Sequence, residues 1–242
     1  MKILAVIPAR YSSQRFPGKP LAQIGDRPMV QWVYEAAKSC PAFSQVVVAT
    51  DDVRIADCVE KFGGKVEMTS PEHPAGTDRV AEVAQRYPEM AAVANVQGDQ
   101  PFVTASMLTQ LVAPYHAGEM PDMTTLASLL EAESGYADPN VVKVICDRQD
   151  NALYFSRSPI PHYREDVEAP VFHHLGLYAF SRNFLLQYAQ LSPTPLETCE
   201  GLEQLRVLEH GYRIRVCYTE TQVIEVNTPE DLSLAQQLAA QP

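Results

Sequence analysis

The sequence lacks the features of a disulfide-rich, zinc-binding or membrane-spanning protein. Its five cysteines are odd in number and no two are closer than 18 residues, so neither a disulfide framework nor a zinc-ligand spacing is present. No apolar run approaches membrane length, and residues 3–7 are too few for a signal-peptide core. We therefore expect reduced thiols, a cytoplasmic location and no stable membrane association.

Positive charge is also scarce. The 242 residues include 19 Lys and Arg against 30 Asp and Glu, a formal net charge of −11. This excess of negative charge disfavours binding to nucleic acid or anionic membranes. Because the cations gather in local clusters, a basic pocket for a small anion fits the composition better. A hydrophobic content of 46% is enough for the core of one large domain.

Apolar runs of strand length alternate with amphipathic segments of helix length in the first half of the chain. The expected strands are 3–7, 45–50, 65–69 and 91–97, and the expected helices are 28–39, 52–62 and 78–87. This alternation predicts an α/β fold with a Rossmann-like, mostly parallel sheet flanked by helices. Functional groups are then expected at the carboxyl ends of the strands.

The second half is less regular. We expect strands at 123–130, 141–146 and 175–180, helices at 198–210 and 229–240, and a proline-containing loop region at 156–174. No repeat, low-complexity tract or linker divides the chain. The pattern predicts a single domain over 1–242, with a smaller lobe inserted roughly within 150–212.

Three cations follow the first predicted strand within ten residues: Arg10, Arg15 and Lys19. Pro17, Gly18 and Pro20 keep this segment from forming a regular helix, so that its backbone N–H groups stay available. One such cation alone would be an ordinary solvated residue. Three cations at the carboxyl end of the first strand predict a polyphosphate site.

Polar side chains elsewhere extend this picture. Asp99 follows the strand 91–97 and could hold Mg²⁺ beside phosphate oxygens, although aspartates commonly stabilise turns at such positions. Asn227 or Thr228 is expected to cap a helix that has Pro229 at its first position. An amide oxygen such as that of Asn227 is a weaker ligand for Mg²⁺ than a carboxylate.

The remaining clusters admit ordinary structural interpretations. Thr77 or Asp78 can cap the next helix, and Gly76 would let the backbone approach a planar ligand. His174 and Tyr178 share one face of a strand and could bind sugar hydroxyls together. A zinc site is disfavoured there, because no third imidazole or thiol lies at ligand spacing. A dehydrogenase is disfavoured too, because no Gly-x-Gly-x-x-Gly follows the first strand.

Eight segments, in order along the chain, resemble one known family. They are 8–21, 75–79, 97–101, 139–143, 154–157, 174–178, 202–211 and 228–232. Together they resemble the 3-deoxy-manno-octulosonate cytidylyltransferase (CMP-Kdo synthetase) family over nearly the whole chain. The opening loop is shared widely among nucleotidylyltransferases. Tyr-Phe-Ser-Arg (154–157), His-Leu-Gly-Leu-Tyr (174–178) and Leu-Glu-Gln-Leu-Arg (202–206) are far more specific to this family.

The resemblance implies a nucleotide-diphospho-sugar transferase-like fold and a reaction that activates an eight-carbon keto-sugar acid for lipopolysaccharide synthesis. In that reaction the anomeric hydroxyl of 3-deoxy-D-manno-octulosonate (Kdo) attacks the α-phosphate of CTP, and pyrophosphate leaves. The resemblance also implies Mg²⁺ as cofactor and a homodimer formed through the smaller lobe.

The resemblance assigns roles to individual residues as well. Arg10, Lys19 and Asp99 would be catalytic, and Asp99 would hold Mg²⁺ with Asn227 as its second ligand. The nucleotide would be bound by Ala9, Arg10, Ser13, Arg15, Lys19, Ala75, Gly76, Thr77 and Arg79. The sugar acid would be bound by Gln97, Arg157, His174, Tyr178, Glu203 and Gln204.

Three positions depart from the family pattern, which usually has Ser at 75, Glu at 100 and Asp at 227. Here these positions carry Ala75, Gln100 and Asn227. Loss of the carboxylate at 227 leaves three possibilities: one metal suffices, Glu225 or the substrate's carboxylate compensates, or activity is impaired. Two alternatives therefore stay open: the same reaction on 8-amino-3,8-dideoxy-manno-octulosonate or another keto-sugar acid, and a catalytically weak CTP-binding regulatory homologue.

Overall fold

The computed structural model describes residues 1–12, 16–130, 133–165, 169–221 and 224–240. It divides into two compact units, residues 1–109 with 223–242 and residues 110–222. Helix α4 (Ala105–His116) contains the boundary between them. We describe each unit by itself, and the smaller lobe expected within 150–212 stays a prediction.

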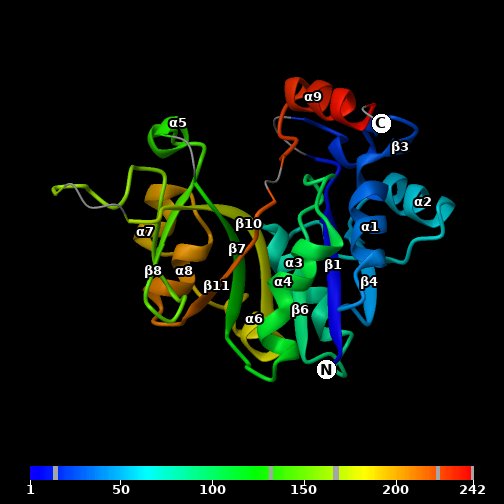
Figure 1. Cartoon of the computed structure of the whole chain (residues 1–242). Coiled ribbons are helices and arrows are strands. Elements are labelled where there is room, and N and C mark those ends of the chain that lie inside the picture. Colours follow the sequence, from blue (N-terminus) through cyan, green and yellow to red (C-terminus); the bar gives the residue numbers. More distant parts are fainter. Residues whose placement is uncertain (13–15, 131–132, 166–168, 222–223, 241–242) are drawn as a thin grey trace. The chain divides into compact units, whose positions relative to one another are not determined.

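The first unit is built on a parallel sheet (Figure 1). Its strands, in spatial order, are β6 (Ala92–Asn95), β1 (Ile3–Ala9), β4 (Gln45–Thr50) and β5 (Val66–Met68). Residues 3–7 of β1 are fully buried, as expected for a parallel strand that is covered on both faces. The helices that pack on these strands are α1 (Met29–Ser39), α2 (Val53–Lys61) and α3 (Gly76–Gln85). The predicted α/β class, with a mostly parallel sheet flanked by helices, is confirmed.

A small substructure follows β1 in the first unit. It comprises the 3-10 helix η1 (Lys19–Leu21), the hairpin β2 (Gln23–Ile24) and β3 (Arg27–Pro28), and the C-terminal helix α9 (Pro229–Ala239). Helix α9 lies against this hairpin (Figure 1), where Gln236 Nε2 donates to the carbonyl of Gln23 over 2.9 Å. Ile24, Met29 and Val226 are fully buried in a shared core cluster. The segment before α9 is thereby anchored in the first unit.

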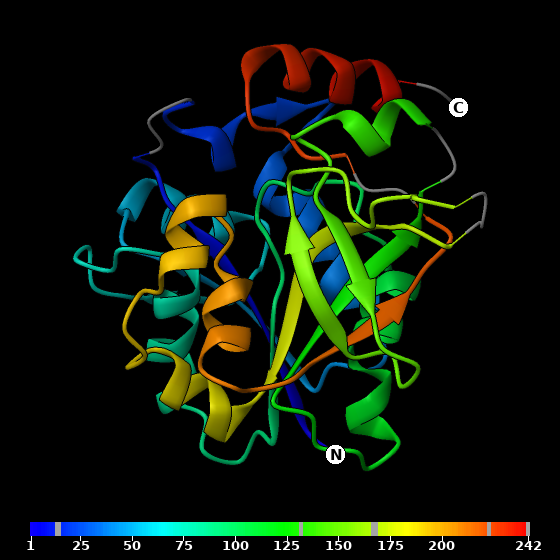
Figure 2. The same cartoon turned by 90° about the vertical axis from the view of Figure 1, so that its left-hand side faces the viewer.

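The second unit contains a mixed sheet (Figure 2). Its strands are β7 (Met123–Leu129), β8 (Lys143–Cys146), β9 (Ala152–Ser156), β10 (Phe172–Ser181) and β11 (Ile214–Tyr218), and its short helices are α5 (Glu133–Ala137), α6 (Arg182–Tyr188), α7 (Pro195–Glu200) and α8 (Gln204–Glu209). Strand β7 pairs in parallel with β11 and antiparallel with β10, while β8 joins β10 to β9 through antiparallel pairs. Strands β7 and β10 carry polar side chains that lie in the centre of this unit.

The structure corrects two expected helices. The helix expected at 78–87 begins at Gly76 with Ala75 at its N-cap, so Thr77 lies inside it, while Asp78 caps it from the first turn by accepting from the N–H of Ala75. The single helix expected at 198–210 is wrong, because α7 ends at Gly201, whose φ of 63° is left-handed. The cap expected for the last helix is confirmed: Thr228 accepts from the N–H of Asp231, and Pro229 takes the first helical position. No helix among the described ranges is long and apolar enough to span a bilayer.

Candidate active site

Two loops at the carboxyl ends of β1 and β6 meet through Lys19 and Asp99. Lys19 Nζ lies 2.9 Å from Asp99 Oδ2, and the two side chains are only 15% and 26% exposed. The same Nζ donates to Asn227 Oδ1 over 3.5 Å. The N–H of Val226 donates to the carbonyl of Asp99 over 2.9 Å, which holds the segment before α9 against this loop. Three residues singled out in the sequence are thus brought together across up to 208 positions.

The donor set of this cluster fits a magnesium ion. Asp99 offers a carboxylate and Asn227 an amide oxygen, and both are the hard oxygen ligands that Mg²⁺ prefers. No three His, Cys, Asp or Glu side chains within the described part of the chain are grouped to hold a metal. Mg²⁺ does not require such a group, because it usually takes one or two carboxylates and completes its shell with water and phosphate.

The loop after β1 is shaped by backbone contacts. Gly18 has a left-handed φ of 73°, and its N–H donates to the carbonyl of Tyr11 over 2.8 Å. Arg10 Nη1 donates to the carbonyl of Pro74 over 3.1 Å, which ties this loop to the segment that leads into α3. Ala9 is buried and can offer a ligand only backbone groups. Ser13 and Arg15 lie outside the described residues.

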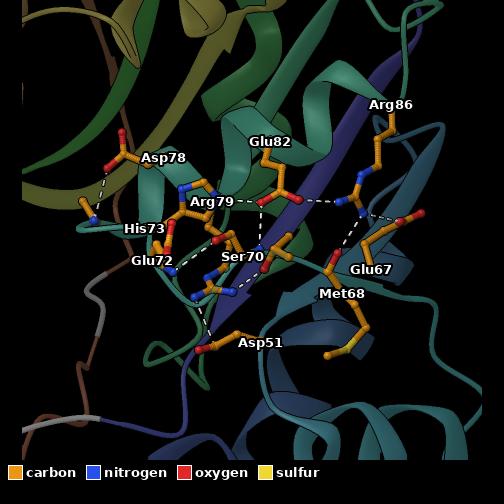
Figure 3. A network of polar contacts seen from close by, with 12 residues as sticks. Asp51, Glu67, Met68, Ser70, Glu72, His73, Asp78, Arg79, Glu82 and Arg86 are labelled. Atoms are coloured by element: carbon orange, nitrogen blue, oxygen red, sulfur yellow. Dashed lines mark hydrogen bonds and ion pairs between the residues drawn. The ribbon is translucent and has the colours of Figure 1, made fainter.

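Arg79 holds the segment before α3 in place through its side-chain contacts (Figure 3). This arginine is fully buried; its Nη2 lies 3.1 Å from Asp51 Oδ1, and its Nη1 donates to Thr69 Oγ1. Burial lowers the pKa of Arg79, and the charge of Asp51 opposes this shift. Thr77 is also buried, and its Oγ1 accepts from Asn95 Nδ2 over 3.3 Å. Both side chains therefore hold the segment in place, and their predicted contact with the nucleotide stays a prediction.

Ala75 and Gly76 present backbone at the start of α3. The N–H of Ala75 donates to Asp78 Oδ2 over 3.1 Å, so Asp78 stabilises the helix start from within the first turn. A Cβ at Gly76 would lie 3.5 Å from Pro8 Cγ, an ordinary contact. At Gly98 a Cβ would lie 2.9 Å from the carbonyl oxygen of Pro8. The close approach of the two site loops therefore requires glycine at 98.

A second polar group beside this segment was not singled out from the sequence. His73 Nε2 lies 2.5 Å from Glu82 Oε2, and this carboxylate also accepts from the N–H of Ser70 over 2.9 Å (Figure 3). Arg86 bonds to Glu82 and, over 3.0 Å, to Glu67 Oε2. The contacts cross from α3 to the end of β5, so they brace the loop between them. The only sequence signal is the run of charges along α3, which is typical of any solvated helix.

In the second unit, His174, Tyr178 and Gln204 form one hydrogen-bond chain. Tyr178 Oη donates to Gln204 Oε1 over 3.1 Å, and Gln204 Nε2 lies 3.4 Å from His174 Nδ1. His174 Nε2 lies 2.9 Å from Thr125 Oγ1, which itself donates to the carbonyl of Leu177 over 2.7 Å. His174 and Tyr178 do share a face, as expected, and Thr125 is a member that the sequence did not reveal.

The direction of this chain fixes the protonation of His174. The hydroxyl proton of Thr125 is used on Leu177, so Thr125 accepts from His174 and the imidazole carries its proton on Nε2. Nδ1 then accepts from Gln204. Burial lowers the pKa of His174 to about 3, helped by neighbouring His173. His174 is therefore neutral at physiological pH and suits hydrogen bonding better than charge pairing.

Arg157 is held by different partners. Its Nε donates to the carbonyl of Glu200 over 2.8 Å and its Nη1 to the carbonyl of Pro139 over 3.0 Å. The backbone of Arg157 is held as well: the fully buried Lys143 donates to the carbonyl of Arg157 over 2.6 Å and to that of Val141 over 2.7 Å. A guanidinium oriented in this way can still pair with a carboxylate.

The last two predicted sugar-acid residues differ in position. Gln97 lies in the loop after β6, where its carbonyl accepts from the N–H of Gln100 over 3.3 Å. Glu203 is exposed at the start of α8, in contrast to the buried Gln204 beside it. Gln97 belongs to the first unit and Glu203 to the second, and the role of each toward a sugar acid stays a prediction.

The chain is similar to known proteins over its whole length. The family described as cytidylyltransferase matches residues 4–214. A protein of Acaryochloris marina named 3-deoxy-manno-octulosonate cytidylyltransferase is 66% identical, covering 98% of this chain and 96% of the relative. A protein of the same name from Synechococcus elongatus is 56% identical, covering 100% and 99%.

Solved structures agree with these similarities. A CMP:2-keto-3-deoxy-manno-octonic acid synthetase complexed with CTP superposes with a TM-score of 0.95 at 39% identity, covering 100% of this chain and 99% of that one. A 4-diphosphocytidyl-2C-methyl-D-erythritol synthase from Anaerococcus prevotii has a TM-score of 0.66 at 16% identity, covering 99% of this chain and 96% of that one. The second likeness concerns the fold alone.

Proposed function

Because the chain belongs to the cytidylyltransferase family, we propose that it joins CTP to 3-deoxy-D-manno-octulosonate, releasing pyrophosphate and forming CMP-Kdo. The observation that carries this proposal is the 66% identity, over almost the full length of both chains, to a protein named for this activity. The cluster of Lys19, Asp99 and Asn227 supports it, because one ammonium group and two oxygen-bearing side chains meet where a triphosphate site was predicted.

The residues of the first unit serve binding and alignment in this proposal. Displacement at a phosphorus atom needs positioned charge more than covalent catalysis. Lys19 and Arg10 neutralise the triphosphate and the charge that develops as pyrophosphate leaves. Ala75 and Gly76 offer backbone groups to the cytosine and ribose, on a segment held by Arg79 and Thr77.

The residues of the second unit receive the sugar acid. Arg157 pairs with its carboxylate, while the chain of Tyr178, Gln204 and His174 offers groups of fixed polarity to its hydroxyls. Neutral His174 does not compete with Arg157 for the carboxylate.

Magnesium is part of the proposal. Asp99 and the Oδ1 of Asn227 would hold it, and when bound it would neutralise phosphate oxygens and polarise the reacting phosphorus. Lys19 holds the Asp99 carboxylate in place through the ion pair between them.

The direct test supplies purified protein with CTP, Mg²⁺ and either Kdo or its 8-amino analogue, and measures pyrophosphate release. Release with Kdo supports the proposal, and preference for the 8-amino acid would change the substrate. CTP binding without release for either acid would instead support the weak regulatory homologue, for which Asn227 is the motivating observation.

The setting of the reaction is proposed from the resemblance and the composition. We infer a cytoplasmic homodimer that supplies CMP-Kdo for lipopolysaccharide synthesis and binds neither nucleic acid nor membranes. Light scattering after size exclusion should give a mass near twice the 26.8 kDa of one chain. A mass of one chain at micromolar concentration would refute the dimer.

A further inference from the structure

Glu225 contacts two carboxamides in the first unit, one with each carboxylate oxygen. Asn227 Nδ2 donates to Glu225 Oε2 over 3.2 Å, and Gln100 Nε2 donates to Glu225 Oε1 over 3.2 Å. Val226 between Glu225 and Asn227 is fully buried, and its N–H is bound by the carbonyl of Asp99. The backbone that carries both polar side chains is therefore fixed beside Asp99.

The two ends of the Asn227 carboxamide have opposite polarity. An amide has nearly the same shape in both orientations, so its partners decide which way it points. With Nδ2 donating to Glu225, Oδ1 faces Lys19 Nζ at 3.5 Å, beside Asp99. In the reverse orientation the NH₂ group would face Lys19 and any cation held by Asp99, which is unfavourable.

We propose that Glu225 is a positioning residue, which holds the Asn227 carboxamide with its oxygen toward the Asp99 metal and phosphate site. Gln100 assists because its Nε2 donates a hydrogen bond to the second oxygen of Glu225, which restricts rotation of that carboxylate. Asn227 thereby acts as an oxygen donor in spite of lacking a charge. This inference rests on the proposed function, because it assigns Glu225 a role in the same site.

The local fold does not depend on this contact. The start of α9 is held by Thr228 and Asp231, whose side chains and N–H groups bond reciprocally over 3.2 and 2.8 Å. The bond from Val226 to Asp99 is made by backbone alone. Substituting Glu225 should therefore release the amide of Asn227 while α9 and its loop stay in place.

The first test compares Glu225→Leu with Glu230→Leu, because glutamine at 225 would keep an oxygen that accepts from Asn227 Nδ2, whereas leucine has none. Both side chains are exposed and both substitutions remove one negative charge, and Glu230 lies in the first turn of α9. Binding of Mn²⁺ is measured by electron paramagnetic resonance, with and without CTP, so that no turnover is needed. Loss of an outer partner of a metal ligand typically weakens metal affinity about tenfold or more. We expect this loss in E225L and wild-type affinity in E230L; equal affinities in the two variants would overturn the proposal.

The second test separates positioning from simple charge. Asp at 227 offers oxygen at both ends, so it needs no partner to set its orientation. In the N227D background, E225L should therefore change Mn²⁺ affinity by less than about twofold, in contrast to the roughly tenfold change with Asn227. An equal loss in both backgrounds would mean that Glu225 acts only through its charge, and would refute the proposal.

Failure of this inference is distinguishable from failure of the proposed function. Wild-type protein that releases pyrophosphate, while E225L and E230L bind Mn²⁺ equally, refutes only the role of Glu225. Wild-type protein that releases no pyrophosphate refutes the proposed function, and the Mn²⁺ comparison still decides the positioning role. Absence of Mn²⁺ binding by the wild type, with or without CTP, overturns the inference.

Discussion

At the scale of single residues, Lys19 has the most direct part in the proposed reaction. Its Nζ lies between Asp99 and Asn227 and is largely shielded from solvent. A positioned cation of this kind is worth far more in a partly dry site than in water, and losing one such group typically costs 100- to 1,000-fold in rate. We expect Lys19→Met to lower kcat for pyrophosphate release by about 100-fold or more.

Lys61→Met is the control for Lys19→Met. Lys61 is exposed at the end of α2, so its substitution changes net charge equally without touching the site. A rate in K19M within about threefold of that in K61M would show that the triphosphate is neutralised by other groups.

Thr125 is expected to determine the tautomer of His174. Replacing it with Val removes the acceptor for the Nε2 proton and leaves a buried donor unsatisfied, which costs about 1–3 kcal/mol. In T125V, imidazole ¹⁵N shifts should move away from the pure Nε2–H pattern, and KM for the sugar acid should rise more than KM for CTP. The matched control is Thr124→Val, because Thr124 is also buried on β7 and donates to the carbonyl of Leu111. Unchanged shifts in T125V would contradict the assigned tautomer.

His174 should also make stability depend on pH. Its pKa is about 3 in the folded protein against 6.5 for the ordinary value, so between these values the unfolded chain binds more protons. Stability therefore falls as pH decreases from about 6.5 toward 3, by up to about 1.4 kcal/mol per pH unit from this group. Burial also lowers the pKa of half-buried His173, which contributes in the same direction.

Urea unfolding at several pH values checks this linkage. In His174→Gln the slope of stability against pH in this window should be shallower by about one proton. An identical slope in the variant would mean that His174 is not the group being titrated.

At the scale of elements, the approach of the β6 loop to the β1 loop depends on Gly98. A Cβ there would lie 2.9 Å from the carbonyl oxygen of Pro8, a backbone atom that cannot rotate away. Overpacking of this kind costs about 1–3 kcal/mol and separates the strand ends that carry the site. We expect Gly98→Ala to lower the free energy of unfolding in urea by that amount and to weaken CTP binding.

Gly76→Ala serves as the stability control for Gly98→Ala. Its Cβ would make only an ordinary contact with Pro8, and alanine favours the helix that begins there. Equal losses of stability in G98A and G76A would show that the backbone near Pro8 yields without cost.

The order of elements around the first sheet was largely predictable from the sequence. Strand and helix periods alternate clearly from residue 3 to residue 97, and the rule that sites lie at carboxyl ends of parallel strands brought Lys19 and Asp99 together in advance. Helix α4 was missed although Leu108, Leu111 and Val112 recur at helical spacing, and it contains Pro114, a residue that usually ends a helix. The helix expected at 198–210 ran through Gly201, whose left-handed backbone ends α7.

Side-chain partners were far less predictable. The sequence placed His174 and Tyr178 on one strand face, and their rings do lie close together although the pairing of β10 with β7 shifts register between them. Thr125 and Gln204, however, reach His174 across 49 and 30 positions. Such contacts depend on strand register and helix placement, which local patterns do not specify. The same holds for the bond between Glu225 and Gln100 across 125 positions.

At the scale of the whole molecule, a net charge of −11 surrounds a small cationic site. Screening shortens the Debye length from about 10 Å at 0.1 M salt to about 3 Å at 1 M, so charge-driven binding weakens as salt rises. We expect the Kd for CTP to rise several-fold between about 0.05 and 0.5 M salt, measured calorimetrically. Neutral cytidine should bind with an affinity that hardly depends on salt, because it lacks the phosphates that Arg10 and Lys19 would neutralise.

Duplex DNA tests the same charge distribution on a larger ligand. Its phosphates would meet the acidic surface of the molecule before reaching the cations at the strand ends, so no binding is expected even at about 0.05 M salt. If DNA bound with a steep salt dependence, the cations would have to form an extended surface patch. If CTP and cytidine shared one salt dependence, Arg10 and Lys19 would not be contacting phosphate, and the triphosphate site would have to lie elsewhere.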